Sequence, residues 1–122
     1  MSRLNMYFKR KEFACRCGCG FDTVDATLLE VLTDLRDFIG EPIVINSGCR
    51  CAKHNSDEGG AKNSQHLYGK AADIRFQSSS KTPLEAIHSY LISKYPDLFG
   101  IAIEGRFVHI DVRSGKAARW SY

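Results

Sequence analysis

The stretch SQHLYGKAADI, from Ser64 to Ile74, joins a polar turn to an apolar segment. It places His66 and Asp73 seven positions apart, with Gly69 between them. The apolar part, KAADIRF, is short and ends in β-forming residues, which predicts a strand. A carboxylate inside such a run is expected to be buried with a partner. The stretch is therefore either a turn that leads into a core strand or two of the three ligands of a metal site.

Regular elements are predicted on both sides of this stretch. Apolar residues at helical spacing, acids at the start and Gly40 at the end indicate a helix over 21–40. A second helix is predicted within 80–96, with a capping box at Thr82–Glu85, Pro83 at the first helical position and its end before Pro96. Short β-rich runs occupy 42–47, 70–76, 100–105 and 107–113. This order predicts an α+β fold with a small, mostly antiparallel sheet and flanking helices.

Length and composition indicate one soluble globular domain. The chain has 122 residues, of which 43% are apolar and 25% charged, and it shows no repeat or linker. We interpret 1–122 as a single domain and expect residues 1–6 to be flexible. The net charge of +3 comes from scattered basic residues, which argues against a nucleic-acid-binding protein.

Localisation is predicted from the apolar segments. No run approaches the roughly 20 apolar residues of a membrane span, and the first residues lack the apolar part of a secretory signal. We expect no membrane insertion, synthesis in the cytoplasm and a monomeric protein.

The last two predicted strands are close enough in sequence to form a hairpin. A type II′ turn at Gly105–Arg106 would pair Glu104 with Phe107, so that Glu104, His109 and Asp111 share one face. His66, Asp73 and His109 can then supply the three protein ligands of a catalytic zinc ion, with Glu104 nearby to accept a proton. The alternatives are a hydrogen-bonded structural histidine and an aspartate that caps a turn.

A family resemblance favours the metal site. The run SGCRCAKHN, the motif S-x-H-x-x-G-x-A-x-D at Ser64–Asp73 and the later FVHIDVR resemble the zinc D-alanyl-D-alanine carboxypeptidase family of the hedgehog/DD-peptidase superfamily, which includes phage cell-wall endopeptidases. The similarity runs from about Phe8 to Trp120. It implies a hedgehog/DD-peptidase-like fold and one catalytic Zn²⁺.

The resemblance also implies roles for individual residues. The zinc ligands fall on His66, Asp73 and His109, and the arginine that stabilises the oxyanion falls on Arg50. Many relatives carry a glutamate or histidine just before the last ligand, where this chain has Arg106 and Phe107. Glu104 is therefore our choice for the general base. Asp111 is the rival, and it can instead orient a ligand.

Four residues beside the ligands in sequence are candidates for holding the substrate peptide, and hydrogen bonding within the loop is the alternative. They are Asn55, Ser64, Gln65 and Tyr68.

The activity implied by the resemblance is hydrolysis of a peptidoglycan stem or cross-bridge peptide at a D-Ala-D-Ala or an L-Ala-D-Glu bond. By analogy we expect a phage or prophage lytic enzyme that acts on the cell wall or periplasm after release, or that is carried in a virion. A non-catalytic zinc-containing binding module of the same fold is the main alternative.

The five cysteines form two groups, Cys15, Cys17 and Cys19 in CRCGCG and Cys49 and Cys51 in GCRC. The first group can bind a second metal with Cys49 or Cys51, but C-x-C-x-C lacks the usual C-x-x-C spacing of zinc knuckles. Our interpretation is reduced, partly buried thiols packed near the Cys49 loop, with a disulfide after export as the alternative. A cysteine-metal redox or nucleic-acid module is a third function considered.

The aromatic residues near the end of the chain receive a structural interpretation. We expect Trp120 and Tyr122 to close the core rather than to bind a sugar.

Overall fold

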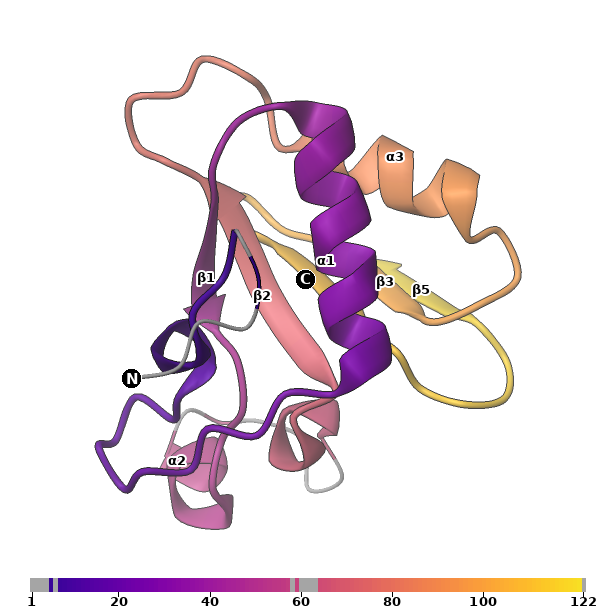
Figure 1. Ribbon diagram of the computed structural model, residues 1–122. Helices are drawn as coiled ribbons and strands as arrows, with labels where there is room; N and C mark the ends of the chain where they lie inside the picture. The colour runs from indigo at the N-terminus through magenta and orange to yellow at the C-terminus, as the bar shows by residue number, and fades with distance from the viewer. Residues whose placement is uncertain (1–4, 6, 58, 60–63, 122) are drawn as a thin grey trace.

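The computed structural model describes residues 5, 7–57, 59 and 64–121. Three α-helices, two 3₁₀ helices and five strands occur in these residues (Figure 1). In chain order they are η1 (Arg10–Phe13), α1 (Ala26–Ile39), β1 (Ile43–Ser47), α2 (Ala52–Asp57), η2 (Gln65–Tyr68), β2 (Ala71–Phe76), α3 (Glu85–Lys94), β3 (Gly100–Ile103), β4 (Val108–Asp111) and β5 (Ala118–Ser121). None of the helices in the described part of the chain is long and apolar enough to cross a membrane.

The strands form one sheet in the order β1-β2-β4-β3-β5. All neighbours are antiparallel except β3 and β5, which are parallel. The predicted α+β class and mostly antiparallel sheet are confirmed. The fifth strand was not predicted, because it is short, half exposed and recognisable only through its pairing with β3.

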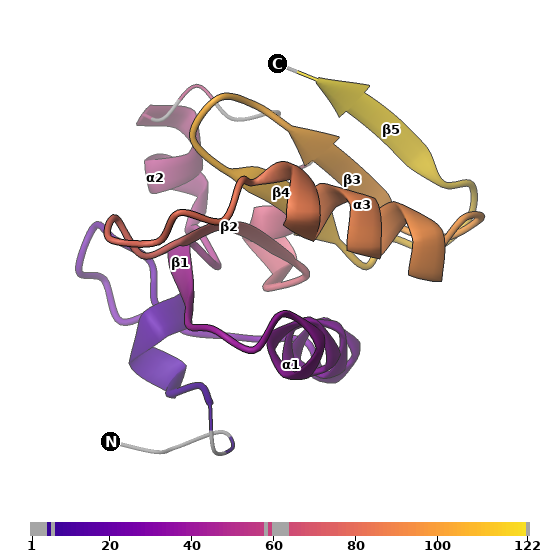
Figure 2. The same ribbon diagram turned by 90° about the horizontal axis from the view of Figure 1, so that it is seen from above.

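The two faces of the sheet have different roles. One face carries Ile74, Ile101 and Ile110 into a core shared with α1 and α3. Figures 1 and 2 show α1 lying across the strands and α3 beside it. Because side chains alternate along a strand, Asp73 and His109 project from the opposite face. The helices therefore bury the apolar face and leave the polar face for a site.

The ends of the two long helices differ in how well they follow the sequence signals. Asp25 caps α1 by accepting hydrogen bonds from the backbone of Thr27 and Leu28, and Gly40 ends it in the left-handed conformation, as predicted. The predicted capping box of α3 is wrong. The Thr82 hydroxyl instead donates to Glu41, 2.6 Å away, and α3 begins at Glu85 without a side-chain cap.

The β3–β4 hairpin has the predicted register. Glu104 N–H donates to Phe107 O at 3.0 Å, and Ala102 lies opposite His109. The predicted type II′ turn is wrong, however, because Gly105 does not have the positive φ that its first central residue requires. The pairing parity, which sets the face of each side chain, is unaffected.

The start of the described chain is attached to α1. Asn5 donates from its side chain to Thr33 Oγ1 at 2.9 Å and accepts from the backbone of Tyr7 and Phe8. The remaining residues of 1–6, which we expected to be flexible, lie outside the described residues.

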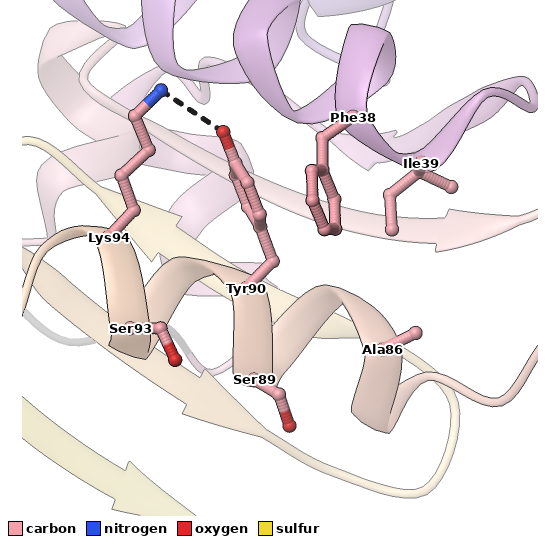
Figure 3. Close-up of a pocket in the computed structure, with 7 residues that line it drawn as sticks. All are labelled: Phe38, Ile39, Ala86, Ser89, Tyr90, Ser93 and Lys94. Atoms are coloured by element: carbon pink, nitrogen blue, oxygen red, sulfur yellow. Dashed lines mark hydrogen bonds between the residues drawn. The ribbon is translucent and has the colours of Figure 1, made fainter.

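An apolar groove separates α1 from α3 on the helical side of the sheet (Figure 3). Phe38, 68% exposed, stacks on Tyr90 with ring centroids 4.4 Å apart. Tyr90 OH also lies 3.1 Å from Lys94 Nζ. The groove lies on the helical side of the sheet, whereas Asp73 and His109 project from the other face, and none of its lining residues is a histidine, cysteine, aspartate or glutamate.

Gly69 provides a test of the turn that leads into β2. Its φ of +66° is left-handed, and an added Cβ would lie 2.5 Å from Thr23 O. We expect Gly69→Ala to lower the free energy of unfolding by about 2–4 kcal/mol. Gly115→Ala is the matched control, because Gly115 has φ +83° but an added Cβ would meet no atom within 4 Å, and it should cost only about 1–2 kcal/mol. Equal losses in urea unfolding would contradict this account.

Candidate metal centre

Three buried side chains from separate segments converge on the polar face of the sheet. Asp73 on β2 lies directly opposite His109 on β4, and His66 comes from η2, just before β2. One ligand atom from each of them lies within 4.8 Å of the others. The exposed fractions are only 3–6%. The structure thus brings together the three residues predicted as ligands.

His66 is oriented by a backbone carbonyl. Its Nδ1 lies 2.6 Å from Gly48 O, so the ring donates its Nδ1 proton there and keeps an Nε2 lone pair. That Nε2 lies 3.4 Å from Asp73 Oδ1. A ligand histidine whose other nitrogen is held by a carbonyl is the usual arrangement in metal sites.

His109 lies between two carboxylates. Its Nδ1 is 2.8 Å from Asp73 Oδ1, and its Nε2 is 2.8 Å from Asp111 Oδ2. Asp111 can accept the Nε2 proton and leave Nδ1 to face the same point as His66 and Asp73. The arrangement matches the carboxylate–histidine pairs that support metal ligands.

Asp111 is fixed by several donors and has no exposed surface. Arg113 donates to it from Nε at 2.7 Å and from Nη2 at 2.6 Å. Gly100 N–H donates at 3.1 Å, and an added Cβ at Gly100 would lie 2.4 Å from the carboxylate. Glycine at this position therefore makes the room that Asp111 needs.

Arg50 lies beside the metal ligands with its guanidinium held on three sides. It donates to Ser47 Oγ at 3.1 Å, to Asn55 Oδ1 at 3.2 Å and to Asp73 Oδ2 at 3.3 Å. A register shift between Ile45 and Ser47 puts Ser47 opposite Asp73, which brings the Arg50 loop over the site.

The other candidates lie in different surroundings. Asn55 is buried and accepts a hydrogen bond from Arg50. Ser64 Oγ accepts a hydrogen bond from His66 N–H at 3.2 Å. Gln65 in η2 is half-buried, and Tyr68 is 56% exposed. Asn55 and Ser64 thus make the local hydrogen bonds that were the alternative interpretation. Only Tyr68 among these four is largely open to solvent.

Glu104 shares the face of His109 but is not one of the three grouped ligands. Its carboxylate is 19% exposed and accepts from Arg106 N–H at 2.5 Å. Its Oε1 makes both contacts with Arg106, the hydrogen bond from the N–H and an ion pair with the exposed guanidinium Nε at 4.0 Å.

Trp120 belongs to the site, which our sequence interpretation missed. It does not join the core: its ring lies 5.1 Å from the His109 ring, and the Arg113 guanidinium lies 5.2 Å from the Trp120 ring centroid. The parallel pairing of β5 with β3 puts Trp120 opposite Ala102, next to His109. Tyr122 lies outside the described residues.

The titration behaviour follows from this geometry. Burial lowers the pKa of His109, but its hydrogen bonds to Asp111 and Asp73 outweigh burial and raise the pKa above its ordinary value. Burial raises the pKa of Asp73, but hydrogen bonds to His109 and His66 hold it well below its ordinary range. The protonation of His109 and that of Asp73 are therefore linked when no metal is bound.

The donor set fits a zinc ion. Two imidazole nitrogens and one carboxylate oxygen are a catalytic zinc set that leaves a position open for water or substrate. The other ring nitrogens also have hydrogen-bond partners, His66 Nδ1 with Gly48 O and His109 Nε2 with Asp111. In the described residues no buried side-chain nitrogen or oxygen lacks a hydrogen bond. His66 Nε2, His109 Nδ1 and Asp73 would hold the ion.

Asp111→Asn should test the support of His109. If Asp111 orients the ring, the variant should bind zinc about 10–100-fold more weakly while remaining folded. The measurement is a chelator competition titration with circular dichroism in parallel. Asp97→Asn, a change at an exposed aspartate, is the control. Unchanged zinc affinity with abolished hydrolysis would instead make Asp111 a catalytic residue.

The raised pKa of His109 predicts a pH dependence of metal binding. Zinc must displace the Nδ1 proton, so affinity should fall by about tenfold per unit as pH drops below that raised pKa. The stability of the metal-free protein should change with pH in the opposite direction to its zinc affinity. Protonated His109 stabilises the fold below its unfolded pKa of about 6.5, and this stabilisation is lost as pH rises through the folded pKa. Zinc titrations between about pH 5 and pH 8 measure the first effect. A flat profile would contradict it.

Comparisons with known proteins agree with this geometry. The Peptidase M15 family model matches residues 6–111. A zinc D-Ala-D-Ala carboxypeptidase of Streptomyces albus G is 34% identical over 92 residues, which cover 74% of this chain and 35% of that protein. The chain thus spans about a third of the length of this curated relative. Since the family model covers most of the chain and all three grouped ligands, the chain belongs to the Peptidase M15 family.

Proposed function

We propose that this protein is a zinc metallopeptidase that hydrolyses an amide bond in the peptide of bacterial peptidoglycan. The observation that carries the proposal is the buried group of His66, Asp73 and His109, with Arg50 held beside it. Membership of the Peptidase M15 family and similarity to a zinc D-Ala-D-Ala carboxypeptidase support the reaction class. Whether the bond is D-Ala-D-Ala or an internal one is part of the test below.

Zinc bound by these side chains supplies a Lewis acid for the scissile carbonyl and for the attacking water. The protein's own contribution begins with Arg50. Its three described hydrogen bonds use three of the five guanidinium N–H donors, and the others can reach a substrate carbonyl. Because Ser47, Asn55 and Asp73 hold the group in place, little reorganisation is needed as negative charge develops on that oxygen.

Glu104 is our proposed general base. It shares the polar face with His109, and its carboxylate is partly open to solvent. Asp111 has no exposed surface and is already engaged by His109, Arg113 and Gly100, so it suits a supporting role better than proton transfer to a leaving amine. In this scheme Glu104 takes a proton from the attacking water and returns it to the amine.

The substrate is proposed to lie along the polar face near Tyr68 and Trp120. Tyr68 is exposed at the end of η2, and Trp120 lies against His109. Aromatic surfaces beside a reactive centre can pack on the apolar parts of a peptide. The expected roles of Asn55, Ser64 and Gln65 in binding the substrate remain predictions, as do phage origin, action after release and a monomeric state.

The direct test is digestion of isolated peptidoglycan, with and without a zinc chelator, followed by mass spectrometry of the new termini. We expect cleavage that the chelator abolishes and zinc restores. Release of D-alanine would identify a carboxypeptidase, and new internal termini an endopeptidase. Chelator-insensitive cleavage would overturn the zinc mechanism, and zinc binding without cleavage would favour a non-catalytic binding module.

Glu104→Gln tests the base. We expect kcat to fall by about 10²–10⁴-fold with little change in zinc content, since glutamine keeps the shape but cannot accept the proton. Glu30→Gln, on the exposed surface of α1, is the matched control and should retain full activity. Wild-type kcat in Glu104→Gln would remove Glu104 from the mechanism.

A further inference from the structure

A second group of possible metal ligands lies outside the candidate metal centre. Cys15, Cys17, Cys19 and Cys51 bring their four sulfur atoms within 4.8 Å of one another. None of these cysteines forms a disulfide in the structure. Of the two candidates for the fourth position, Cys49 is outside the group, because its thiol donates to Phe21 O at 2.9 Å. The fourth member of the group is therefore Cys51.

We propose that Cys15, Cys17, Cys19 and Cys51 bind one zinc ion as a closed, four-thiolate structural site. The proposal is independent of the peptidase function, because none of the four cysteines belongs to the group of His66, Asp73 and His109.

The sulfur separations match such a site. A tetrahedral zinc ion with Zn–S distances of about 2.3 Å has sulfur atoms about 3.8 Å apart. The separations are 3.4 Å for Cys15–Cys17, 3.6 Å for Cys17–Cys51 and 3.8 Å for Cys15–Cys51. These three sulfurs need to move by only a few tenths of an ångström, and Cys19 Sγ lies within 4.8 Å of each of them.

Core packing does not explain why the four sulfurs meet. Cys15 is buried, but Cys17 and Cys19 are exposed and Cys51 is half-buried. Exposed thiols gain little apolar burial from contact with each other and have open solvent available. A shared cation gives these side chains a reason to converge, because zinc binds cysteine as the thiolate and offsets the repulsion among four negative sulfurs.

The backbone is shaped to make this convergence possible. Gly18 and Gly20 have φ of +83° and +91°, and Gly18 N–H donates to Cys15 O at 3.2 Å. These left-handed glycines fold the C-x-C-x-C segment into a tight loop without the usual two-residue spacing. Arg16 fastens the loop to β1 by donating to Ile45 O at 2.5 Å and Asn46 O at 3.3 Å.

The sulfurs also accept hydrogen bonds from the backbone. Cys51 N–H donates to Cys15 Sγ and His54 N–H donates to Cys51 Sγ, both at 3.4 Å. Such N–H···S bonds favour the thiolate and tune metal–thiolate sites. Four protein ligands leave no open position, so the proposed site is structural rather than catalytic.

The location gives the ion a structural task. It would tie the segment before α1 to the start of α2, and Cys51 directly follows Arg50 (Figure 1). The same loop contains Gly48, whose carbonyl orients His66, and α2 contains Asn55, which holds Arg50. Loss of this zinc should therefore loosen Arg50 while leaving the ligands on β2 and β4 in place.

The experiment is a count of zinc per chain after anaerobic purification with a reductant, using mass spectrometry of the metal. The wild type should hold about two ions, and Cys17→Ser, Cys19→Ser and His66→Ala about one each. Cys49→Ser is the matched control: it removes a thiol outside the group and should keep both. Circular dichroism establishes that each variant is folded.

Cobalt substitution assigns the missing ion to a site. The wild type and His66→Ala should show intense sulfur-to-cobalt charge-transfer absorption, and Cys17→Ser should lose most of it. One zinc ion and freely reactive thiols at the exposed Cys17 and Cys19 in the wild type would overturn the proposal, as would disulfides among these cysteines or iron in place of zinc. If only the metal centre of His66, Asp73 and His109 fails to bind zinc, the wild type should hold one ion and still show the sulfur-to-cobalt charge-transfer band.

Discussion

Asp73 and His109 lie directly opposite each other in the antiparallel ladder between β2 and β4, and their side chains leave the sheet on the same face. A slip of one residue in either strand would send one of them into the apolar core. The core itself opposes that slip, because Ile74 and Ile110 are completely buried on the other face. The hydrophobic pattern that folds the sheet therefore also fixes the spacing of two metal ligands.

The orientations of the metal ligands are fixed by residues that hydrogen-bond to them. Gly48 O orients the ring of His66, and Asp111 orients the ring of His109. Asp111 is in turn held by hydrogen bonds from Arg113 and Gly100. A buried polar group without partners is costly, so this network restricts each ring to one orientation. The same loop that carries Gly48 carries Arg50, which couples the geometry of the ligands to that of the proposed oxyanion donor.

The sequence was sufficient for features set by short-range patterns. The helix ending at Gly40, the β3–β4 register and the grouping of His66, Asp73 and His109 follow from periodicity, pairing parity and family resemblance. The failures involve distant partners. Thr82 donates a hydrogen bond to Glu41 rather than capping α3, and Trp120 reaches His109 through a parallel strand that was not predicted. The sequence also left open whether Cys49 or Cys51 meets the first cysteines, and the structure shows that it is Cys51. A local sequence pattern does not predict contacts between residues that lie this far apart along the chain.

Trp120 is the only tryptophan in the chain, and its indole lies 5.1 Å from the ring of His109. A protonated imidazole so close to an indole quenches its fluorescence, whereas a neutral one does so weakly. The tryptophan part of the intrinsic emission therefore comes from beside the proposed ligands rather than from the core. The molecule carries its own optical reporter of the state of His109, readable without a label.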